Sequence, residues 1–169
     1  MVVGFIRNLW WGGDPDKMNE TSGLTLRDVY AVQTSWALIH ADASKHGLEL
    51  FKRLFRADPE TKTFFKSFRI MSEEEFSASY LFRAHAINLM ASINQAVTHL
   101  KQPELVIVMM NKLGESHGRR QVERKHFNVT KVVLVGMLQD LKLSADVINS
   151  WDKCLDFLFE HIFAKLKIF

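Results

Sequence analysis

Two short stretches decide how this chain folds: LGESHGRR at residues 113–120 and FRAHA at residues 82–86. Each contains one histidine, His117 in the first and His85 in the second, with apolar residues around it at helical spacing. Residues three or four positions apart lie on one face of a helix. The neighbours on these faces are Leu81, Leu89 and Ile93 for His85, and Leu113, Met110 and Met109 for His117. The pattern predicts two amphipathic helices, each with an imidazole on its apolar face.

Two interpretations of these histidines stand side by side. A histidine on an apolar face is more often a hydrogen-bonded core residue than a metal ligand. Two of them on separate helices also match an axial iron site, in which each imidazole points into an apolar gap. The sequence has no cysteine cluster and no His-x-x-x-His pair, so it gives little support to a zinc or di-iron site. Its 13 Phe against 2 Tyr favour a large, flat, apolar cofactor over a bare ion.

The rest of the chain predicts helix after helix, so the expected fold class is all-α. Thr25 with Asp28, and Ser72 with Glu75, have the spacing of capping boxes that open helices. Residues 58–60, Asp-Pro-Glu, combine an N-cap, a proline at the first helical position and an acid in the first turn. A further helix begins after Ser144 and contains Trp151.

Three longer helices are expected in the middle of the chain. One runs from Glu73 or Phe76 to about Leu100, and a second starts at residues 102–104 and ends near Gly118. Residues 126–141 are apolar and β-branched enough to form a buried strand. Their length favours a central helix, since strands rarely exceed about 10 residues.

Composition narrows the class of protein. A chain of 169 residues, 47% hydrophobic and 24% charged, is typical of one soluble globular domain. The net charge of +3 comes from interspersed charges, which gives no indication of nucleic-acid binding. The single cysteine, Cys154, forms no internal disulfide; we expect a buried small hydrophobe, with a reactive thiol as the alternative. This cysteine usage fits a reducing, cytoplasmic location.

Residues 1–23 differ from the remainder and predict a flexible N-terminal extension before a domain at residues 24–169. No apolar run in the extension approaches the length of a membrane span, and Arg7 and Asn8 interrupt any secretory signal. The preferred interpretation is a mobile segment whose aromatic side chains pack loosely on the domain. The alternative is a short interfacial anchor with weak membrane contact. Its members would be Val2, Val3, Phe5, Ile6, Leu9, Trp10 and Trp11.

From Leu24 to about Leu166 the sequence resembles the globin family, in order and with nearly constant spacing. WALIHADASKHG at residues 36–47 and LFKRLF at residues 50–55 look like globin helices A and B, and DPET at residues 58–61 looks like the start of helix C. The FRAHA string is similar to insect globins in particular. Trp151 resembles a tryptophan of helix H in invertebrate and neuroglobin-like members.

The resemblance implies a globin fold of about seven to eight helices packed around a haem pocket, with haem b as the cofactor. His117 matches the proximal position that binds the iron, with its other ring nitrogen donating to the Leu113 carbonyl or to Ser116. His85 matches the distal position and is a possible sixth ligand. The implied cofactor-binding residues are Phe51, Phe65, Phe68, His85, Leu89, Leu113, His117, Val122 and Phe127.

Other polar residues have weaker assignments. Arg83, Arg119 and Arg120 are candidates to pair with the haem propionates, and a solvated surface position is at least as frequent for each. The remaining histidines are expected to be structural or on the surface, with a propionate contact by His126 as a minority alternative. They are His40, His46, His99, His126 and His161.

The implied function is reversible binding of dioxygen, for oxygen transport, storage or sensing, with His85 as the main polar contact to a bound gas. An enzyme acting on nitric oxide, nitrite or peroxide is the alternative. It would need an external reductase, because the sequence has no flavin-binding or nucleotide-binding motif. A haem-free helical interaction module is the third class. The sequence does not indicate an oligomeric state.

Overall fold

The computed structural model describes residues 11–166. This part of the chain contains eight helices and no strand, which confirms the all-α prediction. The helices are α2 (Leu26–His40), α3 (Ala43–Ala57), α4 (Pro59–Thr63), α5 (Glu73–Ala78), α6 (Tyr80–Thr98), α7 (Pro103–Gly118), α8 (Arg124–Asp140) and α9 (Ala145–Lys165). Residues 126–141, for which a strand was the alternative, lie almost entirely in α8.

The predicted capping signals open the helices to which they were assigned. Thr25 and Asp28 form a capping box at α2, and Ser72 and Glu75 form another at α5. The Asp58 side chain accepts a hydrogen bond from the Glu60 backbone at the start of α4. Each of these caps pairs a backbone N–H that a helix would otherwise leave without a partner. Local sequence therefore determines where these helices begin.

The single long helix predicted from Glu73 or Phe76 to Leu100 is wrong at one residue. Ser79 has extended backbone with ψ of 123°, and it separates α5 from α6. Its side chain accepts a hydrogen bond from the Phe82 backbone N–H at 3.4 Å, so Ser79 caps α6. Serine competes with the helix by bonding to nearby backbone groups, which favours caps over helix interiors.

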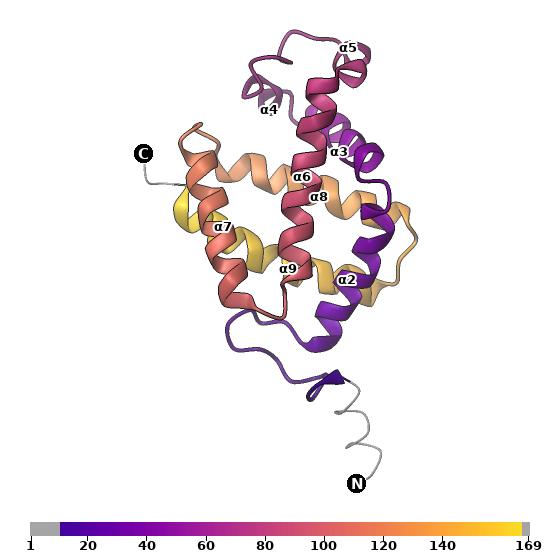
Figure 1. The fold of residues 1–169 in the computed structure, drawn as a ribbon, viewed down its shortest axis with the longest axis vertical. Helices are drawn as coiled ribbons and strands as arrows, with labels where there is room; N and C mark the ends of the chain where they lie inside the picture. Colours follow the sequence, from indigo (N-terminus) through magenta and orange to yellow (C-terminus); the bar gives the residue numbers. More distant parts are fainter. Residues whose placement is uncertain (1–10, 167–169) are drawn as a thin grey trace.

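Figure 1 shows α6 running through the centre of the molecule, with α7 on one side and α2 on the other. Helices α8 and α9 pass behind it, and α4 and α5 lie at its upper end. The loop before α2 crosses beneath α7, where the Thr21 hydroxyl donates to the Glu104 carboxylate at 3.1 Å. This arrangement places α6 and α7, the helices that carry the two histidines, next to each other in space.

Two clusters of buried side chains form the core. The larger one joins α2, α6, α7, α8 and α9 around the fully buried Trp36 and Trp151, whose rings lie 5.9 Å apart. The smaller one lies below α4 and α5 and consists mainly of phenylalanines: Phe51, Phe55, Phe68, Phe76 and Phe82, with Leu54 and Ala86. Leu89 of α6 and Val129 of α8 pack against both clusters. The two histidines lie near this junction.

A buried polar network fastens α2 to α9. The Trp151 indole N–H donates to Ser35 Oγ at 2.8 Å, and the Ser150 hydroxyl donates to Asp28 Oδ1 at 2.8 Å. Burial alone would raise the pKa of Asp28, but hydrogen bonds from Thr25, Ser150 and Lys153 outweigh it and hold that pKa below its usual value. Every member of the network has a partner, so it stabilises the packing of these helices.

Cys154 lies beside this network on α9 and is fully buried, as predicted. Burial raises the pKa of its thiol to about 12, with a smaller contribution from the charge of Asp28. The thiolate is the nucleophilic form of cysteine, so this residue is unreactive in the folded protein.

The predicted extension is described only from Trp11 onward, and the other proposed anchor residues, from Val2 to Trp10, lie outside the described residues. The Trp11 ring packs edge-on against Tyr30 at 5.4 Å and beneath the Arg27 guanidinium at 5.5 Å. Pro15 is buried, and the Asn19 side chain accepts hydrogen bonds from the Thr21 and Ser22 backbone. Within residues 11–166 no helix is long and apolar enough to cross a membrane.

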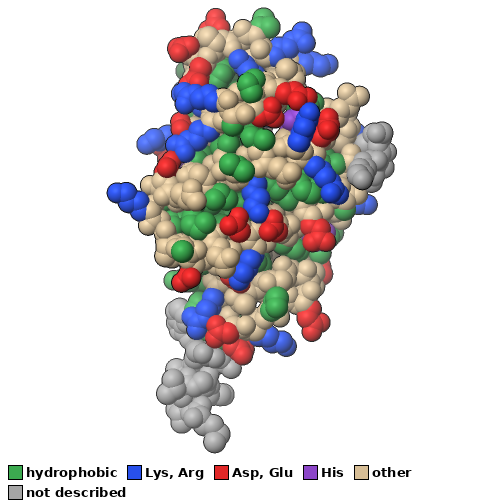
Figure 2. All heavy atoms as spheres, turned by 180° about the vertical axis from the view of Figure 1, so that it is seen from behind, with side chains coloured by type: hydrophobic (Ala, Val, Ile, Leu, Met, Phe, Trp, Pro, Cys, Tyr) green, Lys and Arg blue, Asp and Glu red, His purple; other side chains and the backbone are tan. Residues whose placement is uncertain are grey.

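Positive and negative side chains are mixed on the face of the molecule drawn in Figure 2. Figure 2 shows one face on which Lys and Arg lie beside Asp and Glu, without a large region of one sign. Ion pairs between helices contribute to this pattern, such as Arg53 of α3 with Asp140 at 2.6 Å and Lys131 of α8 with Asp156 at 2.7 Å.

Candidate functional site

His117 lies in the last turn of α7 and is oriented by its own helix. Its Nδ1 donates a hydrogen bond to the Leu113 carbonyl oxygen at 2.9 Å. A carbonyl can only accept, so Nδ1 carries the proton of the neutral ring and the Nε2 lone pair remains available as a ligand. Of the two predicted partners, Leu113 is the observed one. Ser116 Oγ instead accepts a hydrogen bond from Arg120 at 2.7 Å.

The wall next to His117 comes from the corner after α7 and from α8. The Phe127 ring stands edge-on to the imidazole at 5.2 Å and packs against Phe159 and Phe163 of α9. The Val122 backbone N–H donates to the His117 carbonyl at 3.2 Å, and its half-buried side chain packs on the core. This corner turns through Gln121, a non-glycine residue in the left-handed region with φ of 60°.

Two glycines four residues apart bring α7 into direct contact with α9. A Cβ at Gly114 would lie 2.3 Å from the Ile162 carbonyl oxygen, and one at Gly118 would lie 2.9 Å from that of Leu166. Only glycine allows such close approach of two backbones. These residues flank His117, so they fix the height of its helix above α9. The signal in the sequence is the G-x-x-x-G spacing of Gly114 and Gly118 around His117.

His85 lies on α6 on the other side of the same space. Its ring contacts Phe51 of α3 at 5.4 Å and Phe65, which follows α4, at 5.0 Å, and these two phenylalanines also contact each other at 5.4 Å. The side chain is exposed, and no hydrogen bond within residues 11–166 involves its imidazole. Helix α6 itself is held closely, since a Cβ at Gly47 of α3 would lie 2.8 Å from the Ala86 carbonyl oxygen.

Two other predicted residues of this side have different surroundings. Leu89 is half-buried one turn after His85, at the junction of the two core clusters. Phe68 is buried against Phe82 at 5.0 Å, and among the described residues its ring contacts neither histidine. Leu81 was expected on the same apolar stripe, yet it is 62% exposed. The stripe is therefore shorter than the sequence predicts.

The electrostatics keep both imidazoles neutral near pH 7. Burial lowers the pKa of His85, and the charges of His117 and Arg120 lower it further. Burial also lowers the pKa of His117, against the opposing effect of the Leu113 hydrogen bond. Because His117 acts on His85, the two rings share one environment. Of the three predicted arginines, Arg120 acts on both histidines, whereas Arg83 lies over the Tyr80 ring at 5.7 Å.

The other histidines are mostly structural, as expected. His46 and His99 bond through Nδ1 to the carbonyls of Ile39 and Gln95, at 2.7 Å and 2.8 Å. His40 lies near the Trp36 ring, and His161 stands edge-on to Phe157. His126 differs from these, because it is almost completely buried and its Nε2 has no partner among the described residues.

The donor set fits a haem. A neutral imidazole presents Nε2 from one side, a second imidazole without a partner faces the same space, and the walls are phenylalanine, leucine and valine. Leu89, Leu113 and Val122 are only half-buried although they line the inner side of their segments. A large apolar group between α6 and α7 would cover them, and Arg120 supplies a positive charge for an acidic edge.

Comparison with known proteins agrees with this geometry. The Globin family model matches residues 48–162. Cytoglobin-1 of Oryzias latipes is 28% identical over 151 residues, covering 86% of this chain and 85% of the relative. A hexa-coordinate hemoglobin of Drosophila melanogaster superposes with a TM-score of 0.79 at 24% identity, covering 83% of this chain and 94% of that one. A hexacoordinated heme protein from an anhydrobiotic tardigrade superposes with a TM-score of 0.80 at 18% identity, covering 88% of this chain and 99% of that one. The family match spans most of the sequence, and the chain therefore belongs to the globin family of haem proteins.

Proposed function

We propose that this globin binds haem b through His117 and reversibly binds dioxygen on the side of His85. The observation that carries the proposal is the hydrogen bond from His117 Nδ1 to the Leu113 carbonyl, which leaves Nε2 as a ready ligand. Partners of this kind orient a ligating histidine and raise its basicity. When bound, haem supplies the iron atom to which small gaseous ligands attach.

On the other side, His85 is suited to donate a hydrogen bond to a bound ligand. Its ring has no partner to compete for the N–H, and Phe51 beside it has no hydroxyl to do so. A hydrogen bond to a group that carries negative charge contributes about 1.5–3 kcal/mol. Phe51, Phe65 and Leu89 have no proton to donate and are apolar, so they would limit access of water and acid to the bound ligand and slow oxidation of the ferrous iron.

We further propose that His85 is the sixth ligand at rest. Two of the structural relatives are described as hexa-coordinate, which supports the proposal. The unpartnered ring of His85 has rotational freedom that a hydrogen-bonded ring lacks. External ligands must then wait for His85 to leave, so the apparent affinity falls by the fraction of molecules with an open pocket. The alternative is a five-coordinate carrier with His85 close by and unbound.

The test uses protein loaded with hemin, reduced and freed of oxygen. Split, sharp α and β bands in the visible spectrum would identify the six-coordinate state, and His85→Leu should convert them to one broad band. A broad band in the parent that His85→Leu leaves unchanged would contradict the sixth-ligand proposal but not oxygen binding. Reversible spectral change on adding and removing dioxygen tests the latter.

Three further proposals concern the setting of the protein. The domain boundary lies near residue 24, with residues 1–23 as an extension to it. The lone buried Cys154 supports a reducing, cytoplasmic location. An enzyme that consumes nitric oxide, nitrite or peroxide would require a separate reductase. Steady-state turnover with a cellular reductase, compared with the rate of oxygen release, separates that role from a carrier.

A further inference from the structure

We propose that His126 is a positioning residue that links the two walls of the haem pocket. Together with Glu60 and Phe64 it forms a clasp between α4 and the start of α8. The inference rests on the proposed function, because the walls in question are those of the haem site. His126 is almost completely buried, and its Nε2 has no hydrogen-bond partner among the described residues.

One of the two ring nitrogens of His126 has a hydrogen-bond partner and the other has none within residues 11–166. The Glu123 backbone N–H donates to His126 Nδ1 at 3.0 Å, so the proton of the neutral ring is on Nε2. This N–H is buried and has no partner within residues 11–166. A buried donor without an acceptor is costly, and native structures keep such groups for a reason. His126 therefore requires an acceptor close by.

Glu60 of α4 supplies that acceptor. Its Oε1 lies 3.9 Å from His126 Nε2, while its Oε2 accepts from Lys125 Nζ at 2.9 Å. A hydrogen bond forms at about 2.9 Å, so a shift of about 1 Å by the side chain or by α4 completes it. The other charged groups nearby are Asp58 before α4 and Glu123 before α8. Asp58 bonds mainly to Thr61, and the Glu123 carboxylate lies 3.9 Å from Lys125.

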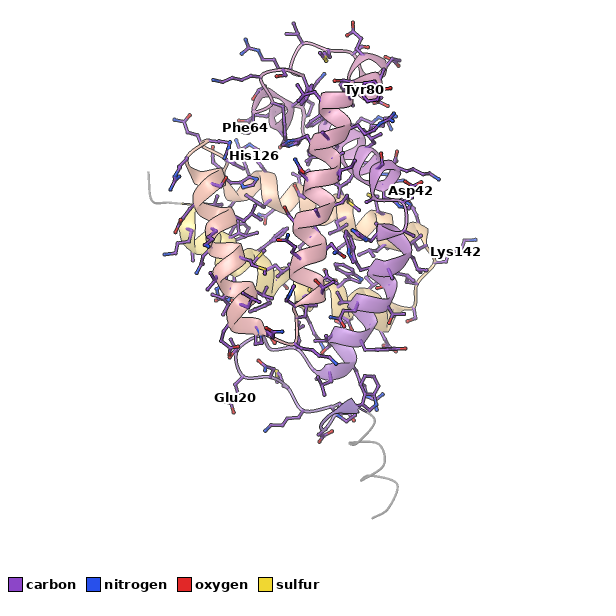
Figure 3. All side chains as sticks on the ribbon, viewed as in Figure 1. Glu20, Asp42, Phe64, Tyr80, His126 and Lys142 are labelled. Atoms are coloured by element: carbon purple, nitrogen blue, oxygen red, sulfur yellow. The ribbon has the colours of Figure 1, made fainter. Side chains whose placement is uncertain are left out.

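The clasp also has an aromatic contact. The Phe64 ring stands edge-on to the His126 ring with centroids 4.8 Å apart, and Figure 3 shows these two side chains next to each other between α4 and α8. A ring pair at this distance and angle is stabilising. Phe64 and Glu60 both lie on the segment that leads to Phe65, so a movement of this segment changes both contacts together.

The sequence neighbours of the clasp give it a role in the pocket. Phe65 follows Phe64 and contacts His85 at 5.0 Å, and Phe127 follows His126 and contacts His117 at 5.2 Å. The Phe65 wall beside His85 and the Phe127 wall beside His117 are therefore each one residue away from the contact between Phe64 and His126. Holding Phe64 on His126 holds Phe65 against His85. Releasing it frees the Phe65 ring and gives the His85 imidazole more room to reach the iron.

The experiment compares variants in the haem-loaded protein. Glu60→Ala removes the acceptor at an exposed position, and His126→Phe removes the donor while keeping a ring. Asp156→Ala is the matched control, because Asp156 is also an exposed carboxylate paired with a lysine of α8, Lys131. Glu60→Gln is the conservative variant, since its amide oxygen can still accept from His126.

The expected result is a larger six-coordinate fraction in ferrous Glu60→Ala and His126→Phe, with carbon monoxide binding slowed to match. The ratio of six-coordinate to five-coordinate protein should rise by about two- to thirtyfold. This is the range for residues that change the coupling between two sites without contacting either ligand. Glu60→Gln and Asp156→Ala should keep the parent ratio. Equal ratios in all five proteins, or a change in Asp156→Ala as large as in Glu60→Ala, would overturn the proposal.

A second readout does not depend on haem. If the parent takes up no haem, the proposed function has failed, and the clasp is then tested by nuclear magnetic resonance of the haem-free protein. Glu60→Ala should shift the His126 Nε2–H and also the ring signals of Phe65 and His85, whereas Asp156→Ala should not. Unchanged signals for Phe65 and His85 would show that the clasp is only local.

Discussion

The two histidine helices are held in similar ways, but the two imidazoles are not. Glycine brings α7 against α9 at Gly114, and glycine brings α3 against α6 at Gly47. His117 is fixed further by its bond to Leu113, whereas His85 has only ring contacts. The difference lies in the side chain rather than in the helix. The comparison teaches that one fold can fix the orientation of one imidazole and leave the other adjustable. A fixed imidazole suits tight binding of a cofactor, and an adjustable one suits the exchange of small ligands.

Removal of each imidazole in turn tests this difference and should have the largest effect. We expect His117→Ala to lower haem affinity by more than the roughly 10–100-fold that loss of an outer partner costs. His85→Ala should retain haem, because the proposed iron ligand, His117 of α7, is still present. Hemin titration of both variants measures the two affinities. Haem loss in His85→Ala alone would reverse the assignment of the two sides.

Gly114→Ala tests whether the close approach of α7 to α9 holds the helix that carries His117. The new methyl group would lie 2.3 Å from the Ile162 carbonyl oxygen, so α7 and α9 must move apart. Overpacking of this kind lowers the free energy of unfolding by about 1–3 kcal/mol. Gly136→Ala in α8 is the control, because nothing lies within 4 Å of its added methyl group. That variant should gain about 0.5–1 kcal/mol from helix propensity.

Both values come from urea unfolding of the haem-free proteins, and the haem spectrum reports whether His117 has moved. If Gly114→Ala proves as stable as the parent, the close approach of α7 to α9 does not fix the position of His117.

The pH dependence of stability should separate the two histidines. Burial lowers the pKa of both below the ordinary value of 6.5, so the unfolded chain binds more protons than the folded one once the pH falls below that value. Stability is then complete above about pH 6.5 and decreases as the pH falls below that value. His117→Leu should flatten this decrease more than His85→Leu, because His117 is less exposed to solvent than His85. Urea midpoints across this range give the profiles. Parallel profiles for the parent and His117→Leu would contradict the assignment.

Gln121→Gly concerns the corner that follows His117 and should have the smallest effect. Gln121 has φ of 60°, a conformation in which a side chain is strained and glycine is not. We expect a gain of up to about 1 kcal/mol in the free energy of unfolding. Lys142→Gly, with φ of 53° after α8, should gain a similar amount far from the haem site. A loss of stability in both variants would mean that their side-chain contacts outweigh backbone strain.

Local signals in the sequence predicted much of this fold. The capping residues Thr25, Asp58, Ser72 and Ser144 each start a helix because the cap acts over only three or four residues. Ser79 is the instructive exception. It lies inside an apolar helical pattern, and its own capping bond to Phe82 decides the outcome.

The site was less accessible to local reasoning. The ring contacts of His85 with Phe51 and Phe65 join three separate segments, and the family resemblance named these residues as cofactor-binding without predicting the contacts. The glycines at 114 and 118 and the buried clasp of His126 depend on which helix lies opposite, and a single sequence does not state this. The orienting bond of His117 was within reach because Leu113 is one turn away on the same helix.

Because Cys154 is buried, the rate at which a reagent labels its thiol reports how often the folded protein opens. Cys154 is the single cysteine of the chain, and its thiol, with a pKa of about 12, lies between α2 and α9. A thiol reagent can reach it only when these helices separate, so the labelling rate in native buffer reports the free energy of that opening. Haem should slow the labelling only insofar as it stabilises the same cooperative unit. Comparing the labelling rates with and without haem therefore measures whether haem binding stabilises the core around Cys154.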